Sequence, residues 1–273
     1  MIKAAVLGSP IAHSLSPALH HAAYEFLGLE GSYEAIDVTS ENLERFLGEI
    51  DDSWTGFSLT MPLKERVLEI VKDVEVLARD ISSANTLIRG GDGWHAVTTD
   101  VNGFRAAMQF RKMENFSSVV ILGSGATARA AARAFDGEGR TITVVHRSMY
   151  RESAMIQAAP LSSVHFLTWG SPIPSVDLLV NTTPRTVADE VASNKSLNFA
   201  GVLFEALYDP WPTSLLSKWK SRGLSCLDGL DLLVHQGIDQ VALMTKMAIV
   251  REDLAPVMRQ AGLDELLGRS HNK

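Results

Sequence analysis

One stretch, from Val119 to Phe135, restricts the possible folds more than any other, because it runs from apolar residues through two glycines directly into an alanine-rich segment. The apolar start predicts a buried strand, and the alanine-rich end predicts a helix. Gly123 and Gly125 lack a Cβ atom, so the backbone can take positive φ and an anion can approach the free N–H groups at the start of the helix. Ala128 provides the small third residue of a G-x-G-x-x-A pattern. We interpret the stretch as a nucleotide-binding turn; a glycine turn needed only for tight packing is the alternative. The candidate contacts are Gly123, Ser124, Gly125, Ala126 and Thr127.

The end of the next β-branched run indicates which nucleotide is bound. Folds that bind NAD usually carry an acidic residue there for the ribose 2′-hydroxyl, whereas folds that bind NADP carry cationic and hydroxyl groups. This chain has His146, Arg147 and Ser148 at that point, followed by Arg151. Arg147 can bind a 2′-phosphate through its planar guanidinium and stack on adenine, and Ser148 can donate to the same phosphate while starting the next helix. We therefore expect NADP rather than NAD; an ordinary exposed arginine and an N-cap serine are the alternative.

Composition excludes several classes of protein. The 273 residues, 46% of them hydrophobic, can form one large or two moderate domains. A net charge of −7 argues against binding to nucleic acid or to an anionic membrane surface. Cys226 is the single cysteine, so we expect no internal disulfide and no metal site. The apolar run near Met1 is too short for a secretion signal, and no apolar run approaches 18 residues, so we expect a cytoplasmic enzyme.

Strand and helix signals alternate along the chain, which predicts an α/β fold with two domains. In the first part we expect strands near residues 3–7, 33–38, 55–61, 84–88 and 94–98, and helices that begin at Ser16, at Ser40 as an N-cap, at Pro62 and at Asp100. Polar residues 112–118 read as a linker. The alternation then restarts, with strands near residues 119–123, 141–146, 163–167, 176–181 and 200–205.

The last two predicted helices, Leu230–Met247 and Asp253–Leu267, have no strand after them. We expect them to pack back on the first domain and to close a ligand cleft between the domains. The prediction is an N-terminal, mostly parallel α/β substrate domain formed by residues 1–102 and 236–273. Residues 103–235 are expected to form a Rossmann-like, doubly wound nucleotide-binding domain.

Lys64 and Asp100 are the first candidates for acid–base chemistry, because each follows a predicted strand at the edge of the sheet where ligands collect. An ammonium in a cleft can hydrogen-bond a substrate oxygen and exchange a proton with it, and the carboxylate can fix its position. On spacing alone, a surface lysine and a helix N-cap aspartate remain the simpler interpretation.

Several motifs in register resemble those of the shikimate dehydrogenase family. They are GSPIAHSLSP at 8–17, LTMPLK at 59–64, SANT at 83–86, Thr99-Asp100, the glycine turn, LYDP at 207–210 with Thr213, and GLDLLVHQ at 229–236. The resemblance implies NADPH-dependent, reversible reduction of 3-dehydroshikimate to shikimate in the pathway to chorismate and aromatic amino acids. It also implies that Lys64 and Asp100 are the catalytic pair and that Ser14 and Ser16 bind the substrate carboxylate. The remaining implied substrate contacts are Ser58, Thr60, Asn85, Tyr208 and Gln236, and the implied nicotinamide-side contacts are Asn181, Thr182 and Gly229.

Each of these residues also has a purely structural alternative. Ser16 could cap a helix, Asn85 could satisfy buried backbone in a turn, Tyr208 could belong to the core, and Gln236 could lie on a solvated helix face. The chain also departs from the family pattern. Ser58 and His146 stand where Asn is common, Glu205 where Asp is usual, Leu63 where a polar residue is common, and the loop at 181–187 has an atypical sequence.

Three other functions stay open. They are an NAD-linked quinate/shikimate dehydrogenase of the same family, a folate-pathway methylene dehydrogenase, and a regulator that binds NADPH without turning it over. Both a monomer and a homodimer are compatible with the sequence.

Overall fold

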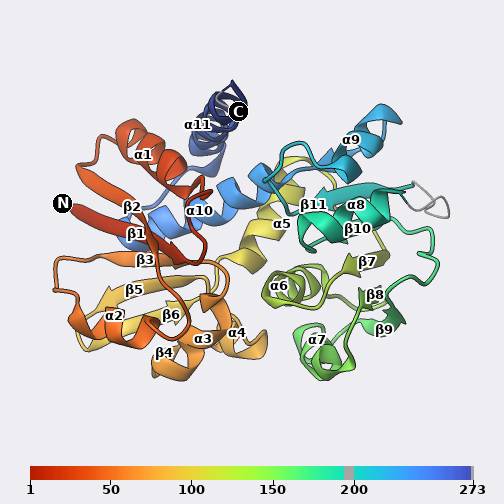
Figure 1. The fold of residues 1–273 in the computed structure, drawn as a ribbon, viewed down its shortest axis with the longest axis horizontal. Coiled ribbons are helices and arrows are strands. Elements are labelled where there is room, and N and C mark those ends of the chain that lie inside the picture. The colour runs from red at the N-terminus through yellow and green to blue at the C-terminus, as the bar shows by residue number, and fades with distance from the viewer. Residues whose placement is uncertain (194–199, 272–273) are drawn as a thin grey trace. The chain divides into compact units, whose positions relative to one another are not determined.

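The computed structural model describes residues 1–193 and 200–271, which form two compact units (Figure 1). The first contains Met1–Gly103 and the chain from Leu233 onward, and the second contains Phe104–Leu232. The chain passes from one unit to the other inside two helices, α5 (Asp100–Phe110) and α10 (Gly229–Thr245). Residues 112–118 were predicted as a linker, but they follow α5 within the second unit. Their polar composition reflects the turn between that helix and the next strand.

The first unit is built on a six-stranded sheet of order β2-β1-β3-β5-β6-β4. Its strands are β1 (Ile2–Gly8), β2 (Gly31–Asp37), β3 (Gly56–Leu59), β4 (Asp73–Val74), β5 (Thr86–Gly90) and β6 (Gly93–Val97). β1 pairs with β2 and β3 in parallel, and β4 pairs with β6 in parallel. The β5–β6 hairpin is antiparallel, and β5 also runs antiparallel to β3. The sheet is therefore mixed, with most pairings parallel as predicted.

Helices cover this sheet (Figure 1). They are α1 (Ser16–Phe26), α2 (Leu43–Glu49), α3 (Leu63–Ile70) and α4 (Val76–Asp80), together with part of α10, and α11 (Arg251–His271) belongs to the same unit. The C-terminal α11 packs along α1, which confirms that the chain returns to its first part. Ser40 does not cap α2, because residues 39–42 form a turn closed by Asn42 N–H donating to Thr39 O at 3.1 Å, and Asn42 is the N-cap residue.

The second unit contains a six-stranded, wholly parallel sheet of order β12-β11-β10-β7-β8-β9. Its strands are β7 (Ser118–Leu122), β8 (Thr141–His146), β9 (Ser163–Thr168), β10 (Leu178–Asn181), β11 (Val202–Glu205) and β12 (Cys226–Leu227). Its helices are α6 (Ala126–Phe135), the 3₁₀ turn η1 (Met149–Arg151), α7 (Glu152–Ala158), α8 (Arg185–Ser193) and α9 (Ser214–Ser221).

This strand order confirms the predicted doubly wound, Rossmann-like fold. The direction of chain progression reverses between β7 and β10, and in such sheets ligands bind outside the carboxyl ends of the strands at that point. The central strands β7, β10 and β11 are almost completely buried, which explains their mostly apolar sequences. Among residues 1–193 and 200–271, no helix is long and apolar enough to cross a membrane.

Candidate active site

Lys64 and Asp100 form a buried ion pair in the first unit. Lys64 is the second residue of α3 and Asp100 is the first residue of α5, so two helix starts bring the side chains together. Lys64 Nζ lies 2.6 Å from Asp100 Oδ2, and the side chains are 15% and 5% exposed. The geometry argues against an ordinary surface lysine, because the ammonium of Lys64 is bound by a buried carboxylate and most of its side chain is covered.

Asn85, just before β5, holds the other oxygen of that carboxylate. Its Nδ2 lies 2.9 Å from Asp100 Oδ1, 2.9 Å from Thr99 Oγ1 and 3.1 Å from Gln236 Oε1, and it can donate to two of these at a time. Its Oδ1 accepts from Thr99 N–H at 2.7 Å. Gln236, on α10, also accepts from Thr99 Oγ1 at 3.2 Å. Four predicted site residues, Lys64, Asp100, Asn85 and Gln236, thus share one hydrogen-bond network.

Gly103 allows Gln236 to reach this network. A Cβ on Gly103 would lie 2.7 Å from Gln236 Cβ and 3.1 Å from Gln236 N, so any larger residue would separate α5 from α10. Close helix approach is a common reason for a glycine inside a helix. Gln236 is only 6% exposed, which rules out a solvated helix face.

The loop before α1 places Ser14 and Ser16 beside one another. Ser14 Oγ accepts from Ser16 N–H at 3.2 Å, and Ser16 is the first residue of α1, after the N-cap residue Leu15. Arg269, near the end of α11, donates to His13 O at 3.0 Å and to Ser14 O at 3.2 Å. The serine loop is therefore held by the C-terminal helix, 255 residues further along the chain.

Ser58 and Thr60 lie at the end of β3. Ser58 is 4% exposed, and its Oγ accepts from Tyr33 Oη at 2.6 Å. Burial strongly raises the pKa of Tyr33, so its phenol stays protonated and donates. Thr60 is only partly buried; a Cβ on Gly8 would lie 2.4 Å from Thr60 Cγ2, so Gly8 permits the threonine to sit there.

The glycine turn of the second unit follows β7 at the point where the strand order reverses. Gly123 has φ +103°, and a Cβ there would lie 2.8 Å from Thr182 Oγ1, on the loop that follows β10. Thr182 is fixed by its own Oγ1–H bond to Leu122 O at 2.7 Å. Gly125 has φ −79°, so it does not need the positive φ that the pattern suggested. Residues 123–127 are all partly exposed.

Four residues at the end of β8 and just after it were predicted to bind the cofactor, and among them the side chains of Arg147 and Arg151 are at least partly exposed. Arg147 is exposed, and Arg151 lies against the glycine turn, where a Cβ on Gly125 would be 3.5 Å from its Nη1. Ser148 precedes η1 without capping it. His146 points inward: its Nδ1 lies 2.7 Å from Ser148 O and its Nε2 lies 3.1 Å from Glu152 Oε1. It shapes the loop that carries Arg147.

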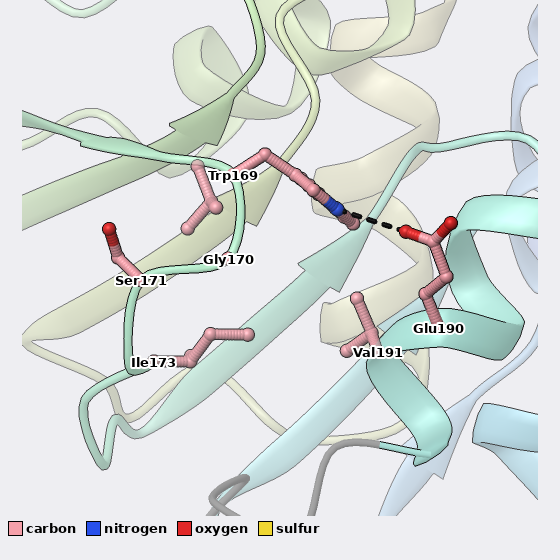
Figure 2. Close-up of a pocket in the computed structure, with 7 residues that line it drawn as sticks. Trp169, Gly170, Ser171, Ile173, Glu190 and Val191 are labelled. Carbon is pink, nitrogen blue, oxygen red and sulfur yellow. Dashed lines mark hydrogen bonds between the residues drawn. The ribbon is translucent and has the colours of Figure 1, made fainter.

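A cavity of about 340 Å³ opens beside the carboxyl ends of β8 and β9 (Figure 2). Its lining consists of Val145, Trp169, Gly170, Ser171, Ile173, Glu190 and Val191. Figure 2 shows the indole of Trp169 reaching Glu190, to which its Nε1 donates at 3.1 Å. Glu190 Oε2 also lies 3.9 Å from Arg147 Nη2, and the Arg147 guanidinium lies over the Trp169 ring at 5.5 Å. Arg147 thus has a carboxylate and an indole as partners.

Asn181 is fully buried at the end of β10. Its Nδ2 donates to Glu205 Oε1 at 2.8 Å, and its Oδ1 accepts from Thr183 Oγ1 at 2.6 Å. Glu205 Oε2 accepts from Thr213 Oγ1 at 2.9 Å. Burial raises the pKa of Glu205 to about 7. Asn181, Thr183, Glu205 and Thr213 are thus joined by hydrogen bonds, and Asn181 stabilises the start of the loop at 181–187.

Tyr208 and Gly229 lie together in the second unit. A Cβ on Gly229 would lie 2.4 Å from Leu207 O and 2.8 Å from Tyr208 N. Gly229 therefore has a packing reason to be glycine at the start of α10, beside any role near a nicotinamide. Tyr208 is partly buried.

The second unit has a glycine turn at the switch point of a doubly wound sheet, and the first unit holds a lysine–carboxylate pair. Together these features are typical of an oxidoreductase that uses a dinucleotide. The family model "Shikimate dehydrogenase substrate binding domain" matches residues 6–87. The shikimate dehydrogenase (NADP(+)) of Thermosynechococcus vestitus is 34% identical over 85% of this chain and 86% of its own. The chain belongs to the shikimate dehydrogenase family, which confirms the predicted family and the class of enzyme.

Solved structures extend this similarity over the whole fold. Shikimate dehydrogenase from Mycobacterium tuberculosis is 35% identical, with a TM-score of 0.85 over 94% of this chain and 99% of that one. The Thermus thermophilus enzyme, solved in complex with NADP(H) and shikimate, is 32% identical with a TM-score of 0.81 over 96% and 100%. The 5-ketofructose reductase of a Gluconobacter species is 25% identical with a TM-score of 0.80 over 96% and 98%. Similar folds thus act on more than one polyhydroxylated substrate.

Sequence reasoning missed several residues that complete these networks. The sequence motifs assign no separate role to Thr99, Gln240, Tyr33, Arg269 or Glu190. Gln240 could have been found, because it lies four residues after Gln236 and therefore on the same face of one helix. Tyr33, Arg269 and Glu190 gave no local signal, since their partners are distant in sequence.

Proposed function

We propose that this chain catalyses the reversible reduction of 3-dehydroshikimate to shikimate with NADPH. The observation that carries the proposal is the buried network in which Asp100 binds Lys64 through one oxygen and Asn85 through the other. A carbonyl that becomes an alcohol needs a positioned proton donor, and a small polyhydroxylated acid needs neutral donors and acceptors around it. The relatives named shikimate dehydrogenase (NADP(+)) support the same substrate and cofactor.

NADP is the cofactor that the second unit fits. Gly123 leaves space where a side chain would meet Thr182, and the partly exposed residues 123–127 include the N-terminus of α6, which suits a pyrophosphate. Arg147, Arg151 and Ser148 would hold the 2′-phosphate. When bound, NADP(H) supplies the hydride chemistry. We assign residues 103–235 to cofactor binding and residues 1–102 with 236–273 to substrate binding.

Lys64 acts on the reacting oxygen in this proposal. Its ammonium donates a hydrogen bond to the substrate carbonyl, stabilises the negative charge that develops on that oxygen, and transfers a proton to it. Asp100 holds the ammonium in place, and Asn85 keeps the carboxylate oriented toward it. The 15% exposure of the Lys64 side chain leaves a route by which water can restore the proton.

The remaining polar residues would bind the ring. Ser14 and Ser16 offer hydroxyl groups for the carboxylate, on a loop fixed by Arg269. Asn85, Gln236 and Thr60, all in the first unit, would bind the ring hydroxyls and carboxylate.

Steady-state kinetics test this function most simply. Shikimate, quinate and the reduced product of 5-ketofructose are each assayed with NADP⁺ and NAD⁺. The proposal expects shikimate with NADP⁺ to give the highest kcat/KM. A preference for quinate with NAD⁺ would favour the NAD-linked alternative, and a preference for the sugar would place the chain with the ketofructose reductase. Absence of turnover in all combinations would favour a redox sensor.

A further inference from the structure

Gln240 is a buried glutamine next to the proposed site that no motif includes. It lies on α10, one turn after Gln236, so both amides extend from the same face of the helix. Gln240 is 1% exposed. A long polar side chain is rarely buried this completely unless all its polar atoms have partners.

Both ends of the Gln240 amide have partners on the sheet. Its Oε1 accepts from Ser58 Oγ at 2.8 Å. Its Nε2 donates to Thr86 Oγ1 at 2.9 Å and to Asn85 O at 3.2 Å. Only an amide can accept in one direction and donate twice in the other from a single position. Glutamate would keep the size but lose the two donated bonds.

These bonds connect Gln240 to the proposed catalytic pair. Thr86 Oγ1 donates to Asn85 Oδ1 at 3.0 Å, and Asn85 Nδ2 reaches Asp100 Oδ1 at 2.9 Å. Asp100 in turn holds Lys64. Gln240 thus binds the backbone carbonyl of Asn85 directly and the side chain of Asn85 through Thr86.

The hydrogen bonds of Ser58 explain why position 240 needs an amide. A serine side chain carries a single hydroxyl group, so Ser58 cannot itself supply the two amide hydrogens that Thr86 Oγ1 and Asn85 O accept. The Ser58 hydroxyl accepts from Tyr33 Oη at 2.6 Å, and it gives its only hydrogen to Gln240. That hydrogen is therefore not free for a substrate while Gln240 is in place.

We propose that Gln240 is a positioning residue that supplies, from α10, the amide that Ser58 lacks, and that it orients Asn85 against Asp100. This inference rests on the proposed function. Gln240 contacts none of the groups assigned to the reacting atoms, so it acts only through Asn85, Thr86 and Ser58.

Kinetics of Gln240 variants provide the first test. Gln240→Glu and Gln240→Ala should each lower kcat/KM for shikimate about 10- to 100-fold, because Asn85 loses donors that hold it. The KM for NADP⁺ should stay within about twofold, since these contacts all lie in the first unit. Leu243→Ala, an exposed position on the same helix, is the matched control. A wild-type kcat/KM in Gln240→Glu, or an equal rise in both KM values, would overturn the inference.

A compensating variant separates positioning from general packing. Ser58→Asn should impair the enzyme by crowding Gln240, and Ser58→Asn with Gln240→Ala should recover kcat/KM to above either single variant. A double variant no better than Gln240→Ala would contradict the proposed exchange of amides.

A crystal structure of Gln240→Ala distinguishes this inference from the proposed function. If the wild-type chain turns over no shikimate, the proposed function fails, but the structure still decides the role of Gln240. An Asn85 side chain turned away from Asp100 would support positioning. An Asn85 side chain that still donates to Asp100 Oδ1 would overturn it.

Discussion

Replacing Glu205 with glutamine removes a buried carboxylate at the end of β11 and should change how the stability of the second unit depends on pH. Burial is the main cause that raises the pKa of Glu205 from 4.5 to about 7, and hydrogen bonds from Leu207 N, Thr213 Oγ1 and Asn181 Nδ2 only partly oppose it. The folded chain therefore holds a proton on Glu205 at pH values where the unfolded chain has released it.

The size of the effect follows from the pKa shift. Each pKa unit corresponds to about 1.4 kcal/mol, so the ionised carboxylate costs the folded state about 3 kcal/mol above pH 7. Because the folded pKa is raised, this cost grows as pH rises from about 4.5 to about 7 and then levels off. Between pH 5 and pH 8 the wild-type free energy of unfolding should fall by about 2.5 kcal/mol relative to Glu205→Gln.

Urea unfolding at pH 5, 6, 7 and 8, followed by tryptophan fluorescence, measures this difference. Glu138→Gln, an exposed carboxylate in the same unit, serves as the control for the loss of one charge. Wild-type and Glu205→Gln curves should converge toward pH 5 and separate toward pH 8. A constant difference between the two free energies of unfolding across this range, or a difference that grows toward pH 5, would contradict a raised pKa for Glu205.

Three further variants probe the two candidate sites. Glu190→Gln should lower the KM for NADP⁺ about two- to fivefold and leave the KM for NAD⁺ unchanged, because the Glu190 carboxylate lies 3.9 Å from Arg147 and competes with a 2′-phosphate for its guanidinium. Equal changes in the two KM values would contradict a role of Arg147 in binding the 2′-phosphate. Arg269→Gln should raise the KM for shikimate about threefold or more, because the loop that carries Ser14 loses the two hydrogen bonds that Arg269 donates to it. The KM for NADP⁺ is the internal control, and an unchanged KM for shikimate would show that α11 does not contribute to substrate binding. Gly123→Ala should weaken NADPH binding about tenfold or more, measured by fluorescence titration, because the new Cβ would meet Thr182 Oγ1. Gly139→Ala also places alanine at a positive φ, but with nothing within 4 Å, and it should leave NADPH binding unchanged; similar losses in both variants would point to backbone strain as the cause.

Local patterns were enough to predict most of the fold. The glycine turn, the β-branched β8 and the turn at residues 90–93 each carry their own signal, so the doubly wound sheet and the β5–β6 hairpin could be expected. β4 and β12 were missed because two residues are too short to show a period of two. The linker prediction was wrong because α5 runs through the boundary between the units as one continuous helix.

The direction of side chains was harder to predict than their position in sequence. His146 and Asn181 stand where cofactor contacts were expected, but both turn inward, because a histidine and an amide at strand ends can satisfy buried backbone and carboxylate groups. Asn85 shows the reverse: a residue that could have served a turn instead links Asp100 with Gln236, 151 residues away. Such pairings depend on tertiary contacts that no local pattern contains.

We propose above all that Lys64, held by Asp100, serves the reacting oxygen and not the cofactor. The most direct measurement compares shikimate turnover and NADPH binding in Lys64→Ala. In Lys64→Ala we expect kcat to fall about a thousandfold or more, while the dissociation constant for NADPH stays within about twofold of the wild type. Weakened NADPH binding together with a normal kcat would contradict it.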